Sequence, residues 1–298
     1  MKILLLGKNG QIGWELQRTL APLGEIIALG RQELDLTDQN AIRHTVRAVK
    51  PDLIVNAAAY TFVEKAEEEP EMAMAVNGIA PGILAEEAAL IKAAIVHYST
   101  DYVFDGNKNE PYTERDNPNP INVYGKTKLA GEEAIIEKQI PHLILRTGWV
   151  YGLRGKNFLL TVLKLAAERT ELTIVDDQHG APTWSRLVSE ATALLIAQNP
   201  FSNISKNNLY HLTAAGETSW FGFAQYILKH ANQIQKPGPA LKAIKTEDYP
   251  TLAARPLNSV LDNSLIGEHC AIIMPDWRKQ LKLALNLRGN ETIKKRVN

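Results

Sequence analysis

Cysteine is nearly absent from this chain, because Cys270 is the single one among 298 residues. One cysteine cannot form an internal disulfide, so a disulfide-stapled secreted scaffold is excluded and a reducing compartment is indicated. An excess charge of either sign is absent too, since 33 basic residues balance 33 acidic ones. Without a net charge, nothing favours a nucleic acid or a membrane surface as a partner.

Long hydrophobic runs and metal-binding spacings are also absent. The apolar run at residues 3–6 ends at Gly7, which is far too short for a signal peptide or a membrane span. The seven histidines are scattered, and none has the spacing of a zinc site. The composition therefore predicts a cytoplasmic enzyme.

The first half of the chain alternates short apolar runs with segments of helical periodicity. We expect strands at residues 2–6, 25–29, 53–55, 94–98 and 143–147, and helices at 11–23 and 38–49. Strands that alternate with helices are typical of a parallel, doubly wound sheet. The predicted fold class is α/β, with a Rossmann-like doubly wound parallel sheet and a smaller C-terminal substrate-binding domain.

A glycine-rich turn follows the first predicted strand, with Gly7, Gly10 and Gly13 spaced three apart. Glycines at a strand-to-helix turn let the backbone approach a pyrophosphate, whose charge then rests at the helix N-terminus. The spacing G-x-x-G-x-x-G differs from the commoner G-x-G-x-x-G. It predicts a dinucleotide site that also includes Gln11 and Ile12.

Residues after the second and third strands should meet the same cofactor. Arg31 follows the second strand, where an arginine suits the extra phosphate of NADP, so NADPH is favoured over NADH. A solvated loop cation explains Arg31 equally well. Asp35 and Leu36 could meet the adenine, although Asp35 could instead close a turn. Mostly small residues after the third strand permit close approach of a ribose or nicotinamide: Ala57, Ala58, Ala59, Tyr60 and Thr61. A packed helix start explains the alanines equally well.

Tyr124 and Lys128 are four residues apart on a predicted helix and so share one face. A free phenol has a pKa of about 10, and a nearby ammonium favours the phenolate and brings proton exchange into range. Thr100, beyond the fourth strand, could polarise a carbonyl while Tyr124 supplies the proton, or could simply cap a turn. The pattern suits carbonyl reduction or its reverse, although Tyr-x-x-x-Lys alone is a weak signal.

Together, the glycine motif, Ser99-Thr100 and Tyr124-x-x-x-Lys128 resemble the extended short-chain dehydrogenase/reductases, which act on nucleotide sugars. Four stretches are most similar to the dTDP-4-dehydrorhamnose reductase family within that superfamily, at residues 56–60, 97–104, 122–131 and 177–183. The resemblance implies a dTDP-sugar substrate whose C4 keto group is reduced by NADPH or NADH. The expected reaction converts dTDP-4-dehydro-6-deoxy-L-mannose to dTDP-L-rhamnose.

The resemblance also implies roles for single residues. Thr100, Tyr124 and Lys128 would form the catalytic set, with Tyr124 and Lys128 also contacting the cofactor. Trp149 would pack against the substrate, although a large aromatic at a strand end could equally belong to the core. The expected substrate-binding residues are Thr100, Asp101, Tyr124, Trp149 and Arg255.

Cations suit the diphosphate of such a substrate because they pair well with its oxygens. Arg255 is the preferred candidate, and the others are the cations Arg154 and Lys156 and the neutral amide Asn157. We place the dinucleotide-binding domain at residues 1–150, with a helix at 185–197 returning to it, and mainly the sugar-nucleotide domain at 151–298.

Three alternatives stay open: a nucleotide-sugar 4-epimerase, another dTDP-4-keto-sugar reductase, and a non-catalytic regulatory nucleotide-binding subunit. A 4,6-dehydratase is disfavoured, because Tyr102 stands where those enzymes carry a glutamate.

Some reductases of the family are described as magnesium-dependent dimers, so a metal is possible in principle. Glu15 could take part, but Arg186 and Leu287 lie where further carboxylates would be expected from the resemblance. A cationic or apolar neighbour works against a hard cation. We therefore predict no metal and no magnesium-bridged dimer, although Glu190 and Glu291 could substitute and a homodimer is possible.

Overall fold

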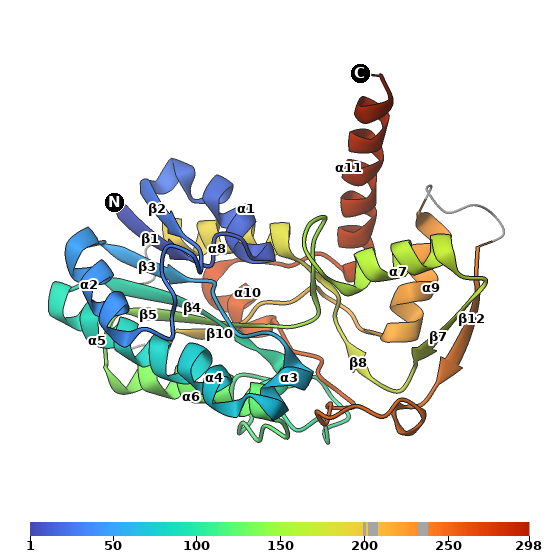
Figure 1. Cartoon of the computed structure of the whole chain (residues 1–298), viewed down its shortest axis with the longest axis horizontal. Coiled ribbons are helices and arrows are strands. Elements are labelled where there is room, and N and C mark those ends of the chain that lie inside the picture. The colour runs from blue at the N-terminus through green and yellow to red at the C-terminus, as the bar shows by residue number, and fades with distance from the viewer. Residues whose placement is uncertain (199–200, 202–207, 232–237, 298) are drawn as a thin grey trace.

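The centre of the protein is a six-stranded parallel sheet with the strand order β10-β5-β4-β3-β1-β2. The structure, a computed structural model, describes residues 1–198, 201, 208–231 and 238–297, with only the backbone described for 289–297. The strands are β1 (Lys2–Leu6), β2 (Glu25–Leu29), β3 (Leu53–Asn56), β4 (Ala94–Thr100), β5 (His142–Thr147) and β10 (Leu209–His211). The predicted Rossmann-like, doubly wound α/β fold is confirmed (Figure 1).

Helices cover both faces of this sheet because its strands are apolar on both sides. In β1, Ile3 and Leu5 enter one core cluster, whereas Leu4 and Leu6 enter the other. The helices on the first face are α1 (Gln11–Thr19) and α8 (Ser185–Ala197), and those on the second are α2 (Gln39–Val49), α5 (Ala80–Ile91) and α6 (Val123–Glu137). The alternating side-chain direction of a strand therefore explains the three layers.

Two predicted element boundaries are wrong by a few residues. The helix expected at 11–23 ends at Thr19 and is followed by a 3₁₀ turn, η1 (Ala21–Leu23). Pro22 explains the break, because proline disfavours a helical residue before it and has no N–H to donate. The strand expected at 94–98 continues to Thr100, because Ser99 and Thr100 pair with β5.

A long apolar helical run consists of α4 (Pro70–Met74), the π-helical segment η2 (Ala75–Ile79) and α5. By length and composition alone, this run could cross a membrane. Half of it is buried, however, and α5 packs against α2 and α6. Its hydrophobicity is therefore accounted for by its place on the sheet.

A second group of elements lies beside the sheet and has its own core. A parallel strand pair, β7 (Glu171–Val175) and β12 (Ala240–Ile244), packs with α7 (Phe158–Glu168) and α9 (Trp220–His230). Two short strand pairs join residues near the carboxyl edge of the main sheet: β6 (Val150–Tyr151) with β9 (Thr183–Trp184), and β8 (His179–Gly180) with β11 (Thr218–Ser219). Figure 1 shows α11 (Trp277–Val297) projecting from this group.

Candidate active site

The predicted site residues gather where parallel strands end at one edge of the sheet. The glycine turn follows β1, residues 57–61 follow β3, and Thr100 ends β4. Trp149 follows β5, and the first turn of α6 brings Tyr124 to Thr100. Because the carboxyl ends of parallel strands meet at one edge, segments far apart in the sequence form one site.

The glycine turn leaves the N-terminus of α1 open. Gly7 has a φ of +81°, and a Cβ there would lie 2.6 Å from the backbone N of Ala58. A Cβ at Gly13 would collide with the carbonyl of Gly7, so both glycines are required by the close packing of the turn. Gly10 is the N-cap of α1 and makes no side-chain cap. The first N–H groups of the helix therefore suit an anionic pyrophosphate.

The Gln11 side chain is committed to the second group of elements. Its Nε2 donates to the carbonyl of Val150 at 3.2 Å, and its Oε1 accepts from Nδ2 of Asn157 at 2.9 Å. Asn157 also caps α7 by accepting from the N–H of Leu160 at 3.0 Å. Because these partners occupy the Gln11 side chain, a contact between Gln11 and a cofactor would come from its backbone.

Two of the residues predicted to bind the substrate diphosphate, Asn157 and Arg154, already have partners near the glycine turn. The Asn157 amide is used for the cap and the Gln11 bond, and the guanidinium of Arg154 stacks on the ring of Trp14 in α1 at 3.3 Å. Lys156 is exposed. None of the contacts described for these three residues involves Arg255.

The loop after β2 holds a carboxylate that our sequence analysis missed. Glu33 accepts from Nζ of Lys8 at 2.5 Å and from the N–H of Gly30 at 2.9 Å, and the Lys8 hydrogen bond lowers the pKa of this carboxyl. Arg31 is largely exposed, and its Nε lies 3.3 Å from Asp35. An anion and a cation thus share the loop where the adenosine end of a dinucleotide binds.

The other two residues predicted on this loop have structural partners. Asp35 closes a turn by accepting from the N–H and hydroxyl of Thr37 at 3.0 and 2.9 Å, and the Thr37 N–H lowers its carboxyl pKa. Leu36 is buried in the core cluster that includes Ile42 of α2. The turn alternative for Asp35 is confirmed, and the Leu36 side chain serves the core.

The side chains of Thr100 and Tyr124 meet at the carboxyl edge, where the Thr100 hydroxyl is close enough to lower the pKa of the phenol. The Thr100 hydroxyl also accepts from the N–H of Tyr102 at 3.1 Å and donates to Asp101 Oδ1 at 3.0 Å. Burial raises the pKa of Tyr124 to about 12, although the Thr100 hydroxyl opposes this shift. Thr100 is therefore both a turn cap and a neighbour of the phenol.

The predicted lowering of the Tyr124 pKa by Lys128 is wrong, because the pKa is raised and Lys128 is not among the groups that shift it. Nζ of Lys128 donates to the carbonyl of Tyr98 at 2.6 Å and lies 3.1 Å from Nε2 of His97. Burial lowers the pKa of Lys128 itself to about 8. Tyr124 and Lys128 lie one turn apart on the same helix face, as predicted. The hydrogen-bond partners of the Lys128 amino group, however, lie on β4.

Asp101 is a buried carboxyl next to Thr100. It is 3% exposed, and its Oδ2 has no hydrogen-bond partner among the described residues. A Cβ at Gly148 would lie 2.5 Å from this carboxyl, so glycine is needed there. Burial raises the pKa of Asp101 to about 6, against the effect of the Ser259 and Thr100 hydroxyls. Asp101 thus places a buried carboxyl between the hydroxyls of Thr100 and Ser259.

The N-terminus of α6, which carries Tyr124, is held from two sides. Asn122 caps the helix by accepting from the N–H of Gly125 at 2.7 Å, and its Nδ2 donates to the carbonyl of Ala254 at 2.8 Å. Glu67 accepts from the N–H of Val123 at 2.8 Å. A carboxylate at a helix N-terminus is favourable, so Glu67 and Asn122 position the phenol without contacting it.

Trp149 does not present a free face in this structure. Its backbone has a φ of +51°, and its ring stacks on Trp220 with centroids 3.4 Å apart and an interplanar angle of 1°. Nε1 of Trp149 donates to Ser259 at 3.1 Å, and Nε1 of Trp220 donates to Gln178 at 3.2 Å. Trp220 is distant in the sequence and was missed, because nothing local in the sequence indicates this stack.

Arg255 is already ion-paired. Its guanidinium lies 2.7 Å from Glu64 of α3 (Val63–Glu68), which also accepts from the N–H of Ala253. Its Nε is buried without a hydrogen-bond partner among the described residues. Arg255 is therefore held in place with one donor unused.

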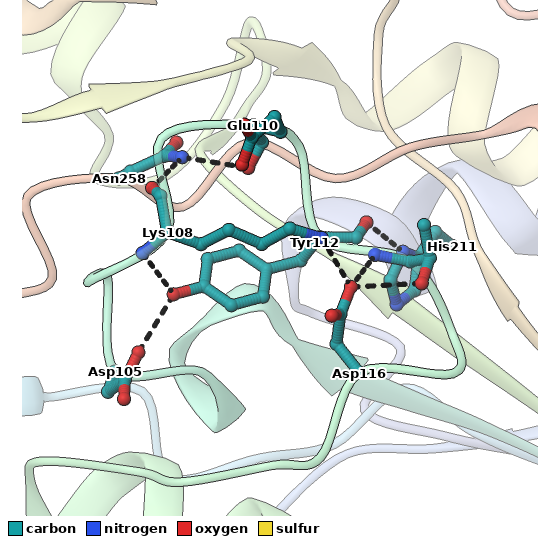
Figure 2. A network of polar contacts seen from close by, with 8 residues as sticks. Asp105, Lys108, Glu110, Tyr112, Asp116, His211 and Asn258 are labelled. Atoms are coloured by element: carbon teal, nitrogen blue, oxygen red, sulfur yellow. Dashed lines mark hydrogen bonds and ion pairs between the residues drawn. The ribbon is translucent and has the colours of Figure 1, made fainter.

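The loop between β4 and α6 is held near the site by the network in Figure 2. Tyr112 donates its hydroxyl to Asp105 at 2.8 Å, and Lys108 pairs with Asp116 at 2.8 Å. Asn258 donates to the carbonyl of Lys108 at 2.7 Å. These contacts tie the loop to residues 258–262, and Ser259 in that segment supports Trp149.

The region considered for a metal contains ion pairs instead. Glu15 lies 3.3 Å from Arg186 and 3.5 Å from Arg18, and Arg18 lies 3.0 Å from Glu190. Within the part of the chain that the structure describes, no group of three potential metal ligands is found. The Glu291 side chain lies outside the described residues. The metal-free chemical step stays a prediction.

A doubly wound sheet with an open glycine turn and a threonine–tyrosine pair beside a buried lysine defines an extended short-chain dehydrogenase/reductase. The sequence matches the family model described as RmlD substrate binding domain over residues 1–288. The chain belongs to the dTDP-4-dehydrorhamnose reductase family, and it is an oxidoreductase that uses a nicotinamide cofactor.

Individual relatives are similar over nearly the whole chain. A dTDP-4-dehydrorhamnose reductase of Burkholderia thailandensis is 46% identical over 96% of this chain and 98% of its own length. The Escherichia coli K12 reductase is 45% identical over 96% and 97%.

Solved structures agree with this assignment. The reductase of Clostridium acetobutylicum has a TM-score of 0.89 and 36% identity, covering 97% of this chain and all of that one. The Bacillus anthracis reductase, solved in complex with NADP, has a TM-score of 0.86 and 34% identity over 95% of this chain and 98% of that one.

Proposed function

We propose that this protein reduces the C4 keto group of dTDP-4-dehydro-6-deoxy-L-mannose to form dTDP-L-rhamnose, with NADPH as the favoured cofactor. The observation that carries the proposal is the approach of the Thr100 and Tyr124 hydroxyls to each other at the sheet edge, one helical turn from buried Lys128. Two hydroxyls that meet at one point can both contact a single carbonyl oxygen.

The residues of the chain would move the proton while the reduced nicotinamide, when bound, supplies the hydride. Because the pKa of Tyr124 is raised to about 12, the phenol is protonated at neutral pH and is ready to donate to the carbonyl oxygen. Thr100 would turn its hydroxyl from Asp101 to that oxygen. Lys128, whose pKa is about 8, is charged below that pH and would stabilise the phenolate left behind.

The cofactor is proposed to lie along the glycine turn, residues 31–36 and residues 57–61, close to Tyr124 and Lys128. The sugar nucleotide is proposed to contact Thr100, Asp101, Tyr124, Trp149 and Arg255. Under this proposal residues 1–150 hold the cofactor, together with α8, which packs on α1, and β10, which pairs with β5. The remainder of 151–298 would hold the sugar nucleotide.

Assay of the purified protein against a panel of 4-keto dTDP-sugars tests the proposed reaction. We expect stoichiometric oxidation of NADPH and a product with the L-rhamno configuration by NMR. Interconversion of C4 epimers without net NADPH consumption would identify an epimerase. No turnover with any of these sugars would favour the regulatory subunit.

Cofactor selectivity should depend on Arg31. We expect Arg31→Ala to raise KM for NADPH about tenfold or more while barely changing KM for NADH, because charge-assisted hydrogen bonds contribute about 1.5–3 kcal/mol. Steady-state kinetics with both cofactors measures the ratio. Glu33→Gln is the matched control on the same loop, and it should not reduce the preference for NADPH. Equal effects of Arg31→Ala on both cofactors would show that Arg31 does not contact the phosphate.

Substrate affinity should depend on the stack between Trp149 and Trp220. We propose that the sugar replaces Trp220 on the face of Trp149, so bound substrate must first break a contact worth about 0.5–1.5 kcal/mol. Trp220→Ala should then lower KM for the sugar nucleotide about two- to tenfold, whereas Trp149→Ala should raise it. A rise in KM in both variants would instead make Trp220 part of the binding surface.

A further inference from the structure

A buried chain of polar side chains runs behind Lys128 and has no part in the mechanism above. The N–H of Ala58 donates to Oδ1 of Asn56 at 3.2 Å, and Nδ2 of Asn56 lies 3.2 Å from Nδ1 of His97. The opposite ring nitrogen, Nε2, lies 3.1 Å from Nζ of Lys128. Asn56, His97 and Lys128 are each at most 1% exposed, so they depend on one another for hydrogen bonds.

The donors and acceptors along this chain determine which ring nitrogen of His97 carries the proton. Because the Asn56 oxygen is occupied by the Ala58 N–H, the amide nitrogen faces the ring, and that nitrogen can only donate. Nδ1 of His97 is therefore an acceptor. Burial and the charge of Lys128 lower the pKa of His97 well below its ordinary value, so the ring is neutral. A neutral imidazole with an accepting Nδ1 carries its proton on Nε2.

The Nε2–H of His97 therefore points at Nζ of Lys128, and an ammonium there would place two donors against each other. We infer that His97 is a positioning residue whose Nε2–H faces Nζ of Lys128 and favours the neutral amine, so that Lys128 loses its charge at a lower pH than it would without this donor. Lys128 meanwhile donates to the carbonyl of Tyr98 at 2.6 Å. To become charged, Lys128 must give up its contact with His97. The inference rests on the proposed catalytic role of Lys128.

Other groups near Lys128 modify this balance. Glu132, one turn further along α6, raises the pKa of Lys128, but it is itself paired with Arg146 of β5 at 2.6 Å. The other groups that approach this part of the helix are the phenol of Tyr124, the carboxyl of Asp101 beside that phenol, and neutral Asn77 of η2, which bonds to Thr127. Burial outweighs them all and lowers the Lys128 pKa.

The proton position can be measured without substrate or cofactor. Long-range proton–nitrogen NMR of the ligand-free protein, labelled with ¹⁵N-histidine, distinguishes the two neutral forms and the charged form of each ring. The His97 signals are those missing from the spectrum of His97→Gln. We expect a neutral ring protonated at Nε2. A ring protonated at Nδ1, or at both nitrogens, would overturn the inference.

Asn56→Asp should reverse the direction of the hydrogen bonds that link residue 56, His97 and Lys128, with almost no change in side-chain shape. An aspartate accepts from both the Ala58 N–H and the ring, so the His97 proton moves to Nδ1 and Nε2 accepts from a Lys128 ammonium. Activity that needs the ammonium is lost as the pH rises through the Lys128 pKa. We therefore expect the basic limb of the kcat–pH profile to move up by about one unit or more.

His97→Gln is the matched variant, because its amide N–H can replace Nε2–H as a donor to Lys128. Its basic limb should stay within a few tenths of a unit of the wild-type position, even if kcat falls. A basic limb that does not move in Asn56→Asp would overturn the inference, since a merely structural role lowers kcat at every pH. If Asn56→Asp does not fold, the NMR result alone decides.

Failure of the proposed function has a different signature. Lys128→Met with normal turnover would refute the catalytic role of Lys128 but would leave the NMR test of the His97 proton valid. The NMR result and this variant therefore separate the two ideas.

Discussion

Tyr124→Phe is expected to lower kcat by about a hundredfold or more, the usual scale for loss of a positioned general acid. The change removes one hydroxyl and keeps the ring, so the edge-to-face contact with Tyr102 at 6.0 Å should persist. The circular dichroism spectrum and the dissociation constant for NADPH should remain close to those of the wild type. Steady-state kinetics with the keto-sugar nucleotide, together with these two measurements, checks the prediction.

Tyr102→Phe is the matched control for this experiment. Tyr102 is the neighbouring tyrosine, and burial raises the pKa of its phenol as well, but the hydrogen bond described between Tyr102 and Thr100 comes from the backbone N–H of Tyr102. We expect it to retain turnover within a few-fold of the wild type. Near-normal kcat in Tyr124→Phe would refute the proposed mechanism, because Tyr124 is the residue whose phenol lies beside the Thr100 hydroxyl.

The largest effect on stability is expected from the buried ion pair between Arg146 and Glu132. The two side chains form two hydrogen bonds, at 2.9 and 2.6 Å, and are 4% and 1% exposed. Arg146→Met leaves the Glu132 carboxylate buried without its partner, which costs about 3–5 kcal/mol. We expect the free energy of unfolding, measured by urea titration, to fall by that amount.

The double variant Arg146→Met, Glu132→Leu distinguishes the effect of losing the ion pair from the effect of leaving one buried charge without its partner. Replacing both ions of a buried pair with apolar side chains is often nearly neutral, so most of the lost free energy should return. If the double variant is as unstable as Arg146→Met alone, packing of Arg146 over the Phe104 ring, 5.2 Å away, is the main contribution.

The core pattern of the sheet was predictable because it is local. In β1 the alternation of Ile3, Leu4, Leu5 and Leu6 between two core clusters follows directly from the two-residue period of a strand. The glycine turn was predictable for the same reason, since backbone that needs a positive φ at Gly7 needs glycine at that position. The boundaries were less certain, because β4 is extended by pairing with β5.

The candidate site was only partly predictable. Thr100 and Tyr124 could be assigned to one edge of the sheet because strand order and helix position follow from the alternating pattern. Trp220, Glu33 and Glu67 could not, because each acts through a contact formed by folding: the stack on Trp149, the pair with Lys8, and the bond to the N-terminus of α6. None of these contacts has a local sequence signature.

The sequence by itself therefore determined the class of fold, the dinucleotide turn, and the one-turn separation of Tyr124 and Lys128, because strand alternation, glycine conformation and helical spacing are properties of neighbouring residues. Only the tertiary structure decided the proton chemistry. Local spacing predicted an ammonium that lowers the Tyr124 pKa, whereas burial raises that pKa to about 12, and Lys128 turns to Tyr98 and His97 of β4. A pKa depends on desolvation and on partners brought from distant parts of the chain, and those exist only once the chain has folded.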